Sequence, residues 1–139
     1  MNHSRNLVPL PVRIVVGTFG LFALGYGISG YLNADSLVPD FRADVGANHT
    51  LAMMFSARNI AIGIVTLLVA FRGVPESIAA ILIVRFLIEL QDLINTIASG
   101  NRTPISLPAL LPVIAFMVIE AIVVVTLFKI IEKRDKTVI

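Results

Sequence analysis

The stretch 77–99 is otherwise apolar, yet it carries three charged residues where a lipid bilayer tolerates almost none. Arg85, Glu89 and Asp92 occupy positions i, i+4 and i+7 of this stretch, so they share one face of a helix. Each charge costs about 2.5–3.5 kcal/mol at the centre of a membrane span, which disfavours a position facing lipid. We therefore expect this face to contact protein or a water-filled cavity, and this cavity is the leading candidate for a functional site.

The composition and the apolar runs of the chain indicate a membrane protein. Of the 139 residues, 57% are hydrophobic and 14% are charged, whereas a soluble domain usually has about 25% charged residues. Four runs are long enough to cross about 30 Å of hydrocarbon as helices: 14–32, 50–71, 77–99 and 105–128. The sequence predicts an all-α fold, in which residues 1–139 form one integral membrane domain built as an antiparallel bundle of four transmembrane helices.

Lysine and arginine residues are distributed unevenly between the segments that connect these runs. With the N-terminus inside, the inner segments hold Arg5, Arg13, Arg72, Lys129, Lys133, Arg134 and Lys136, and the outer loops hold only Arg42 and Arg102. An excess of basic residues marks the cytoplasmic side of a membrane protein. We expect both termini to be cytoplasmic, in a multi-pass protein of a bacterial inner (plasma) membrane.

The residue types that bind metals and redox cofactors are scarce in this chain. It has no cysteine, which excludes disulfides, thiolate metal sites and dithiol chemistry. The two histidines, His3 and His49, are far apart in the sequence, which disfavours a zinc site or a bis-histidine haem. We expect no metal, no cofactor and no nucleic-acid partner. The expected partners are the lipid bilayer and a lipophilic small molecule.

Depth along the helices decides which charged groups can pair. Counted from the outer end of each run, Arg58 is eight residues deep, Asp92 seven and Glu89 ten. At about 1.5 Å per residue these three lie within about one helical turn of each other in depth. Arg85 lies fourteen residues from Ser99, and Glu120 lies fourteen residues from Ser106, near the outer end of the last run. The sequence predicts that Arg58 pairs with Asp92 or Glu89, and that Arg85 pairs with Glu120 or Glu89.

The predicted spans together contain two arginines and three carboxyl groups, so full ionisation would leave one negative charge uncompensated. Burial favours the neutral form of a carboxyl and a nearby guanidinium favours the ionised form, so we expect one of the acids to carry a proton at neutral pH. A protonated carboxyl beside a carboxylate held by arginine suits general acid–base catalysis. The candidate catalytic residues are Glu89 and Asp92, as acid and base, and Glu120, which closes the network. The candidate substrate-binding or orienting residues are Arg58, Arg85, Asn59, Asn95 and Tyr26.

Part of this pattern resembles the DoxX-like group of small four-helix membrane proteins. The resemblance rests on Ala57-Arg58-Asn59 followed by Gly63, and on Arg85, Glu89 and Asp92 in the next apolar run. It covers the second to fourth runs, is similar to uncharacterised bacterial branches of the group, and implies a four-helix bundle. The name-giving member is linked to a quinol-oxidising complex, but this chain has no cofactor motif that would carry that redox role across.

We predict that the protein binds a lipophilic small molecule in a small polar pocket near the outer side, and we favour an enzyme. Cyclisation, isomerisation and epoxide opening need only a proton donor, a base and an oriented substrate. The alternatives are a proton-coupled transporter, because intramembrane carboxylates also serve proton relays, and a small subunit of a membrane complex, including a quinone-linked one. A purely structural charge network that locks the helices together is a further alternative. Association into a homo-oligomer is one way to enlarge the pocket.

Overall fold

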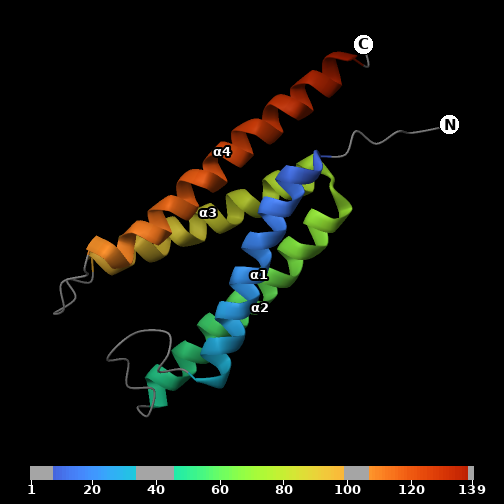
Figure 1. The fold of residues 1–139 in the computed structure, drawn as a ribbon. Coiled ribbons are helices and arrows are strands. Elements are labelled where there is room, and N and C mark those ends of the chain that lie inside the picture. Colours follow the sequence, from blue (N-terminus) through green and yellow to red (C-terminus); the bar gives the residue numbers. More distant parts are fainter. Residues whose placement is uncertain (1–7, 34–45, 99–106, 138–139) are drawn as a thin grey trace. The chain divides into compact units, whose positions relative to one another are not determined.

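The computed structural model describes residues 8–33, 46–98 and 107–137. Within these ranges the fold is all-α, and the helices are α1 (Leu10–Leu32), α2 (Gly46–Arg72), α3 (Pro75–Ala98) and α4 (Leu107–Thr137). Figure 1 shows them as two pairs, α1 with α2 and α3 with α4. Each pair forms a compact unit, and the boundary between the units falls after Gly73.

Three helices in the described part of the chain are long and apolar enough to cross a membrane. They cover Leu10–Leu32, His49–Arg72 and Val113–Lys136, each 23 or 24 residues long. At about 1.5 Å per residue such a helix spans about 35 Å, which exceeds the hydrocarbon thickness of about 30 Å. The fourth helix, α3, has 24 residues and differs from the others by its three central charges. Its role as a fourth span stays a prediction.

The α1–α2 unit is an antiparallel helix pair in which the two backbones lie very close together at glycine residues. A Cβ atom added to Gly63 of α2 would lie 2.6 Å from the backbone nitrogen of Leu24 in α1. A Cβ atom added to Gly27 of α1 would lie 2.7 Å from the backbone nitrogen of Ile60 in α2. Residues without bulky side chains let two helix backbones approach this closely. The small residues on the buried face of α1 are Gly20, Ala23, Gly27 and Gly30.

The first helix begins earlier than the apolar run suggests. The run predicts a start at residue 14, whereas α1 begins at Leu10, with Pro9 as its N-cap residue at φ −50° and a proline in its first turn. A proline there costs no hydrogen bond, because the first N–H groups of a helix have no intrahelical acceptor. Pro9 and Pro11 therefore start the helix instead of delaying it.

One side chain of α1 satisfies the carbonyl groups at the end of α2. The Arg13 Nε atom donates to the Ala70 carbonyl at 2.8 Å, and Arg13 Nη2 donates to the Phe71 carbonyl. These carbonyls lie in the last turn of α2, where the helix provides no donor of its own. Gly73 then ends α2 at φ +68°, with its N–H bonded to the Val69 carbonyl at 2.9 Å. This left-handed conformation favours glycine.

The α3–α4 unit is also an antiparallel pair. Glu76 at the start of α3 pairs with Arg134 near the end of α4, and Arg85 in the middle of α3 pairs with Glu120 in the middle of α4.

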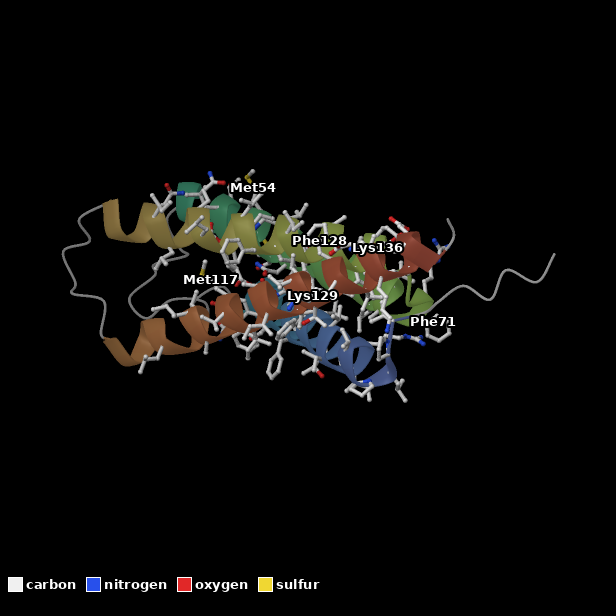
Figure 2. All side chains as sticks on the ribbon, turned by 90° about the horizontal axis from the view of Figure 1, so that it is seen from above. Met54, Phe71, Met117, Phe128, Lys129 and Lys136 are labelled. Carbon is white, nitrogen blue, oxygen red and sulfur yellow. The ribbon has the colours of Figure 1, made fainter. Side chains whose placement is uncertain are left out.

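The last helix, α4, continues to Thr137, beyond the predicted end at residue 128. In Figure 2, Met117, Lys129 and Lys136 follow one another along this helix. An ion pair between Lys136 and Glu132, one turn apart, supports this polar extension. The predicted ends of the last two runs at residues 99 and 105 lie outside the described residues.

Candidate functional site

The central element of the site is a buried ion pair between α3 and α4. Arg85 lies three residues after Leu82 on α3, and Glu120 lies three residues after Met117 on α4, so each charge continues a buried apolar stripe. The exposed fraction of Arg85 is 7% and that of Glu120 is 0%. The Arg85 Nε atom donates to Glu120 Oε1 at 2.8 Å. This is the short, charge-assisted geometry that holds a buried pair together.

The same guanidinium also binds a second carboxylate. The Arg85 Nη2 atom donates to Glu89 Oε1 at 3.1 Å, across one turn of α3. The Glu89 side chain is 25% exposed, in contrast to the fully buried Glu120. The prediction that Arg85 pairs with Glu120 or Glu89 is therefore confirmed, since Arg85 pairs with both. We call Arg85, Glu89 and Glu120 the arginine–glutamate cluster.

Each glutamate of the cluster uses only one of its two oxygens. Glu89 Oε2 and Glu120 Oε2 are buried, and neither has a hydrogen-bond partner within the described ranges. Buried carboxylate oxygens in proteins almost always accept a hydrogen bond, because an unpaired one loses its hydration without compensation. The cluster also holds two acidic groups against one guanidinium. It is therefore suited to hold a proton or a ligand that donates hydrogen bonds.

Two further candidates lie on the same helix, beyond Glu89. Asp92 follows Glu89 by three residues, which puts both on one face of α3, and its side chain is partly exposed. Asn95 is exposed. Across the part of the chain that the structure describes, no group of three or more histidine, cysteine, aspartate or glutamate side chains is placed to hold a metal ion.

The remaining candidates belong to the α1–α2 unit and meet at Phe55, a residue that the sequence analysis missed. The guanidinium carbon of Arg58 lies 4.8 Å from the centre of the Phe55 ring, within the range of a cation–π contact. The Tyr26 ring meets the same ring edge to face, with centroids 5.8 Å apart. The Asn59 amide donates to the Phe55 carbonyl at 2.9 Å. Phe55 precedes Arg58 by three residues and Asn59 by four, and this helical spacing was the available signal.

The structure thus brings the candidates together in two groups, one in each unit. Arg58, Asn59 and Tyr26 surround Phe55 in one unit, and Arg85 joins Glu89 to Glu120 in the other. The predicted pairing of Arg58 with Asp92 or Glu89 would join the two units, and it stays a prediction.

Comparison with known proteins gives no match: no protein family, no curated protein and no solved structure matches this chain. The likeness to the DoxX-like group therefore stays a prediction from the sequence. The fold and the site define a helical protein with three potential membrane-spanning helices in its described part. Its arginine–glutamate cluster is buried between α3 and α4.

Proposed function

We propose that this chain is an integral membrane protein that binds a lipophilic small molecule and exchanges protons with it at the arginine–glutamate cluster. The observation that carries the proposal is the shared guanidinium: Arg85 bonds Glu89 and Glu120 at once, and the second oxygen of each glutamate is buried without a partner among the described residues. Two buried carboxylates beside one guanidinium leave one uncompensated negative charge, which a proton neutralises. A group that gains and loses one proton is what acid–base catalysis requires.

Such a cluster would supply both halves of an acid–base reaction. One glutamate, kept ionised by Arg85, accepts a proton from the substrate, and the other, in its protonated form, donates a proton to it. The number of protons on the protein is the same before and after each turnover. Cyclisation, isomerisation and epoxide opening all fit this balance, because each moves protons without a net redox change. Asp92, one turn beyond Glu89, is the third candidate for the acid or the base.

The membrane setting of the proposal goes beyond the three apolar helices. We assign α3 as a fourth span in an antiparallel four-helix bundle of the DoxX-like kind, with both termini in the cytoplasm and the protein in a bacterial inner membrane. The excess of Lys and Arg in the inner segments supports this orientation. The bonding of Arg85 to two carboxylates supports a buried α3, since it offsets charges that lipid would not tolerate.

Infrared spectroscopy of the purified protein in lipid nanodiscs tests the proposal. At pH 7 we expect a carbonyl stretch from one protonated carboxyl, which shifts in heavy water and disappears in Glu89→Gln or Glu120→Gln. Glu132→Gln is the matched control, because Glu132 is an exposed glutamate of the same α4 helix. Full ionisation of every carboxyl in the wild-type protein at pH 7 would refute the proton exchange.

Proton-coupled transport is the second candidate function. The observation that favours it is the gradient of burial within the cluster, from Glu89 at 25% exposure to Glu120 at 0%, since a relay needs one accessible and one enclosed acid. Proteoliposomes that enclose a pH-sensitive dye separate the two functions. A transporter would acidify or alkalinise the lumen when substrate is added outside, whereas an enzyme would convert the substrate and leave the luminal pH unchanged.

A further inference from the structure

We infer that the ligand of the arginine–glutamate cluster is a lipophilic amine, which binds as its ammonium ion in place of the proton. This inference rests on the proposed function and names the chemical class of the substrate. It follows from three features of the cluster: its charge, its free acceptor atoms and its apolar surroundings.

The charge of the cluster favours a cation. Arg85 supplies one positive charge, and Glu89 and Glu120 supply two negative charges when ionised. A ligand with a carboxylate or phosphate group would increase the imbalance in a buried place, which is costly. A neutral alcohol would leave the imbalance as it is, whereas an ammonium ion removes it.

The free acceptor atoms favour a ligand with several N–H donors. Glu89 Oε2 and Glu120 Oε2 belong to different helices, and both are buried without a partner in the described segments. Their carboxylates converge on one guanidinium through their Oε1 atoms. A primary ammonium group has three N–H donors, which is enough for one hydrogen bond to each Oε2 atom. A hydroxyl group has a single donor and can satisfy only one of them.

The surroundings of the cluster favour an apolar body on the ligand. On α4, Glu120 lies between the buried residues Met117 and Val123, each three residues away, and on α3, Arg85 follows the fully buried Leu82. These neighbours offer hydrocarbon on either side of the charges. An alkyl or aryl amine would place its polar head at the carboxylates and its carbon chain along these side chains.

Binding of the ammonium ion and binding of the proton then exclude each other. Both neutralise the same negative charge, so an amine that binds at neutral pH displaces the proton from the cluster. The N–H group of the bound ammonium ion then takes the place of the protonated glutamate as the proton donor, and a glutamate carboxylate remains the acceptor. The charged groups involved are Arg85, Glu89 and Asp92 on α3 and Glu120 on α4. Binding should therefore release about one proton for each ammonium ion bound.

Calorimetry and proton-release measurements on the protein in nanodiscs test this inference, with octylamine as the probe. We expect saturable binding of octylamine and the release of about one proton into a weakly buffered solution. Octanol has the same chain without the charge, and trimethyloctylammonium has the charge without N–H donors. Each should bind about tenfold or more weakly than octylamine, because each lacks charge-assisted hydrogen bonds to the carboxylates. Empty nanodiscs give the background of partition into lipid.

Three variants show whether the cluster is the binding site. Glu120→Gln and Glu89→Gln should each weaken octylamine binding about tenfold or more and abolish the proton release. Glu132→Gln should bind octylamine like the wild-type protein. Gel filtration and circular dichroism verify that each variant is folded, and Glu89→Gln, at the more exposed position, serves if Glu120→Gln does not fold. Equal affinity for octanol, octylamine binding that persists in both cluster variants, or binding without proton release would overturn the inference.

A pH titration without any amine keeps the two proposals distinguishable. If the wild-type protein takes up a proton that Glu120→Gln does not, but octylamine fails to bind, the amine assignment is wrong and the acid–base function stands. If no such proton uptake occurs, the proposed function fails, and the inference that rests on it fails as well.

Discussion

At the scale of single residues, Arg85 is the side chain whose loss should cost the most stability. It bonds two carboxylates, one of them fully buried, and removal of one member of a buried ion pair costs about 3–5 kcal/mol because the remaining charge is uncompensated. We predict that Arg85→Gln lowers the free energy of unfolding by this amount, measured by reversible unfolding in mixed detergent micelles at pH 7. The exposed Arg72 gives the control Arg72→Gln, which should change stability by less than about 0.5 kcal/mol. Equal losses in the two variants would contradict a central role for Arg85.

Glu76 gives a smaller, pH-dependent contribution at the end of the same helix pair. Its hydrogen bond with Arg134 holds the pKa of the Glu76 carboxyl below the usual value of 4.5. A group whose pKa is lower in the folded state stabilises the fold above its unfolded pKa, and this stabilisation is lost as the pH falls through the folded pKa. Because both side chains are partly exposed, the effect should be at most about 1 kcal/mol.

The expected result is therefore a stability difference between the wild-type protein and Glu76→Gln that is present at pH 7. The difference should shrink toward zero as the pH falls below the ordinary carboxyl pKa of 4.5 and through the lower pKa of Glu76 in the folded protein. The measurement is unfolding in detergent as a function of pH. In the Arg134→Gln background, Glu76→Gln should have little further effect at any pH. An undiminished effect of Glu76→Gln in that background would show that Arg134 is not the cause.

Single residues also show what the sequence could predict about the site. Counting depth along antiparallel helices put Arg85 level with Glu120, and they do pair, because rise per residue is nearly constant in α-helices. The count did not reveal that one guanidinium would bind two glutamates, nor that Phe55 would support Arg58 and Tyr26. Those contacts depend on side-chain rotamers and on the rotation of each helix about its axis, and a count of residues along the helix gives information about neither.

At the scale of elements, the glycines of the α1–α2 pair make a prediction with built-in controls. We expect Gly63→Ala and Gly27→Ala to destabilise the protein by about 1–3 kcal/mol, since the new methyl group would meet backbone atoms at 2.6–2.7 Å and force the helices apart. Gly17→Ala and Gly25→Ala should be neutral or stabilising by up to about 1 kcal/mol, because a Cβ atom there meets nothing within 4 Å and alanine favours the helix. Thermal unfolding of the four variants measures the difference. Equal effects at all four positions would show that helix propensity, and not close packing, governs these sites.

The interiors of the helices were easier to predict than their ends. The small residues Gly20, Ala23, Gly27 and Gly30 are all buried in α1, and their helical spacing in the sequence is sufficient to place them on one face. The ends were less well predicted, because an apolar run indicates which residues can contact lipid or a protein core. It does not indicate where the hydrogen bonds of the helix begin or end. The first turn of α1, which contains Pro11 and Arg13, and the charged turns at the end of α4 are helical, although neither is apolar throughout.

At the scale of the whole molecule, the decisive question is whether α3 crosses the membrane. If all four helices cross, the N- and C-termini lie on the same side, and if only the three most apolar helices cross, the termini lie on opposite sides. The second arrangement would put Lys129, Lys133, Arg134 and Lys136 outside, against the positive-inside tendency. The first arrangement requires the three charges of α3 to be offset within the protein. The bonds from Arg85 to Glu89 and Glu120 provide part of this compensation.

The absence of cysteine from the sequence makes this question accessible to site-directed labelling. In bacterial spheroplasts treated with a membrane-impermeant maleimide, we predict that Asp40→Cys is labelled from outside. Asn2→Cys and Lys136→Cys should be labelled only after the membrane is permeabilised. The reason is that buried ion pairs and inner basic flanks together make a charged span less costly than an outward-facing basic C-terminus. Labelling of Lys136→Cys in intact spheroplasts, with Asn2→Cys still protected, would show that α3 does not cross. Glu120 lies inside the α4 span Val113–Lys136, so an α3 helix outside the hydrocarbon could not keep the Arg85–Glu120 ion pair, and the proposed intramembrane site would be refuted as well.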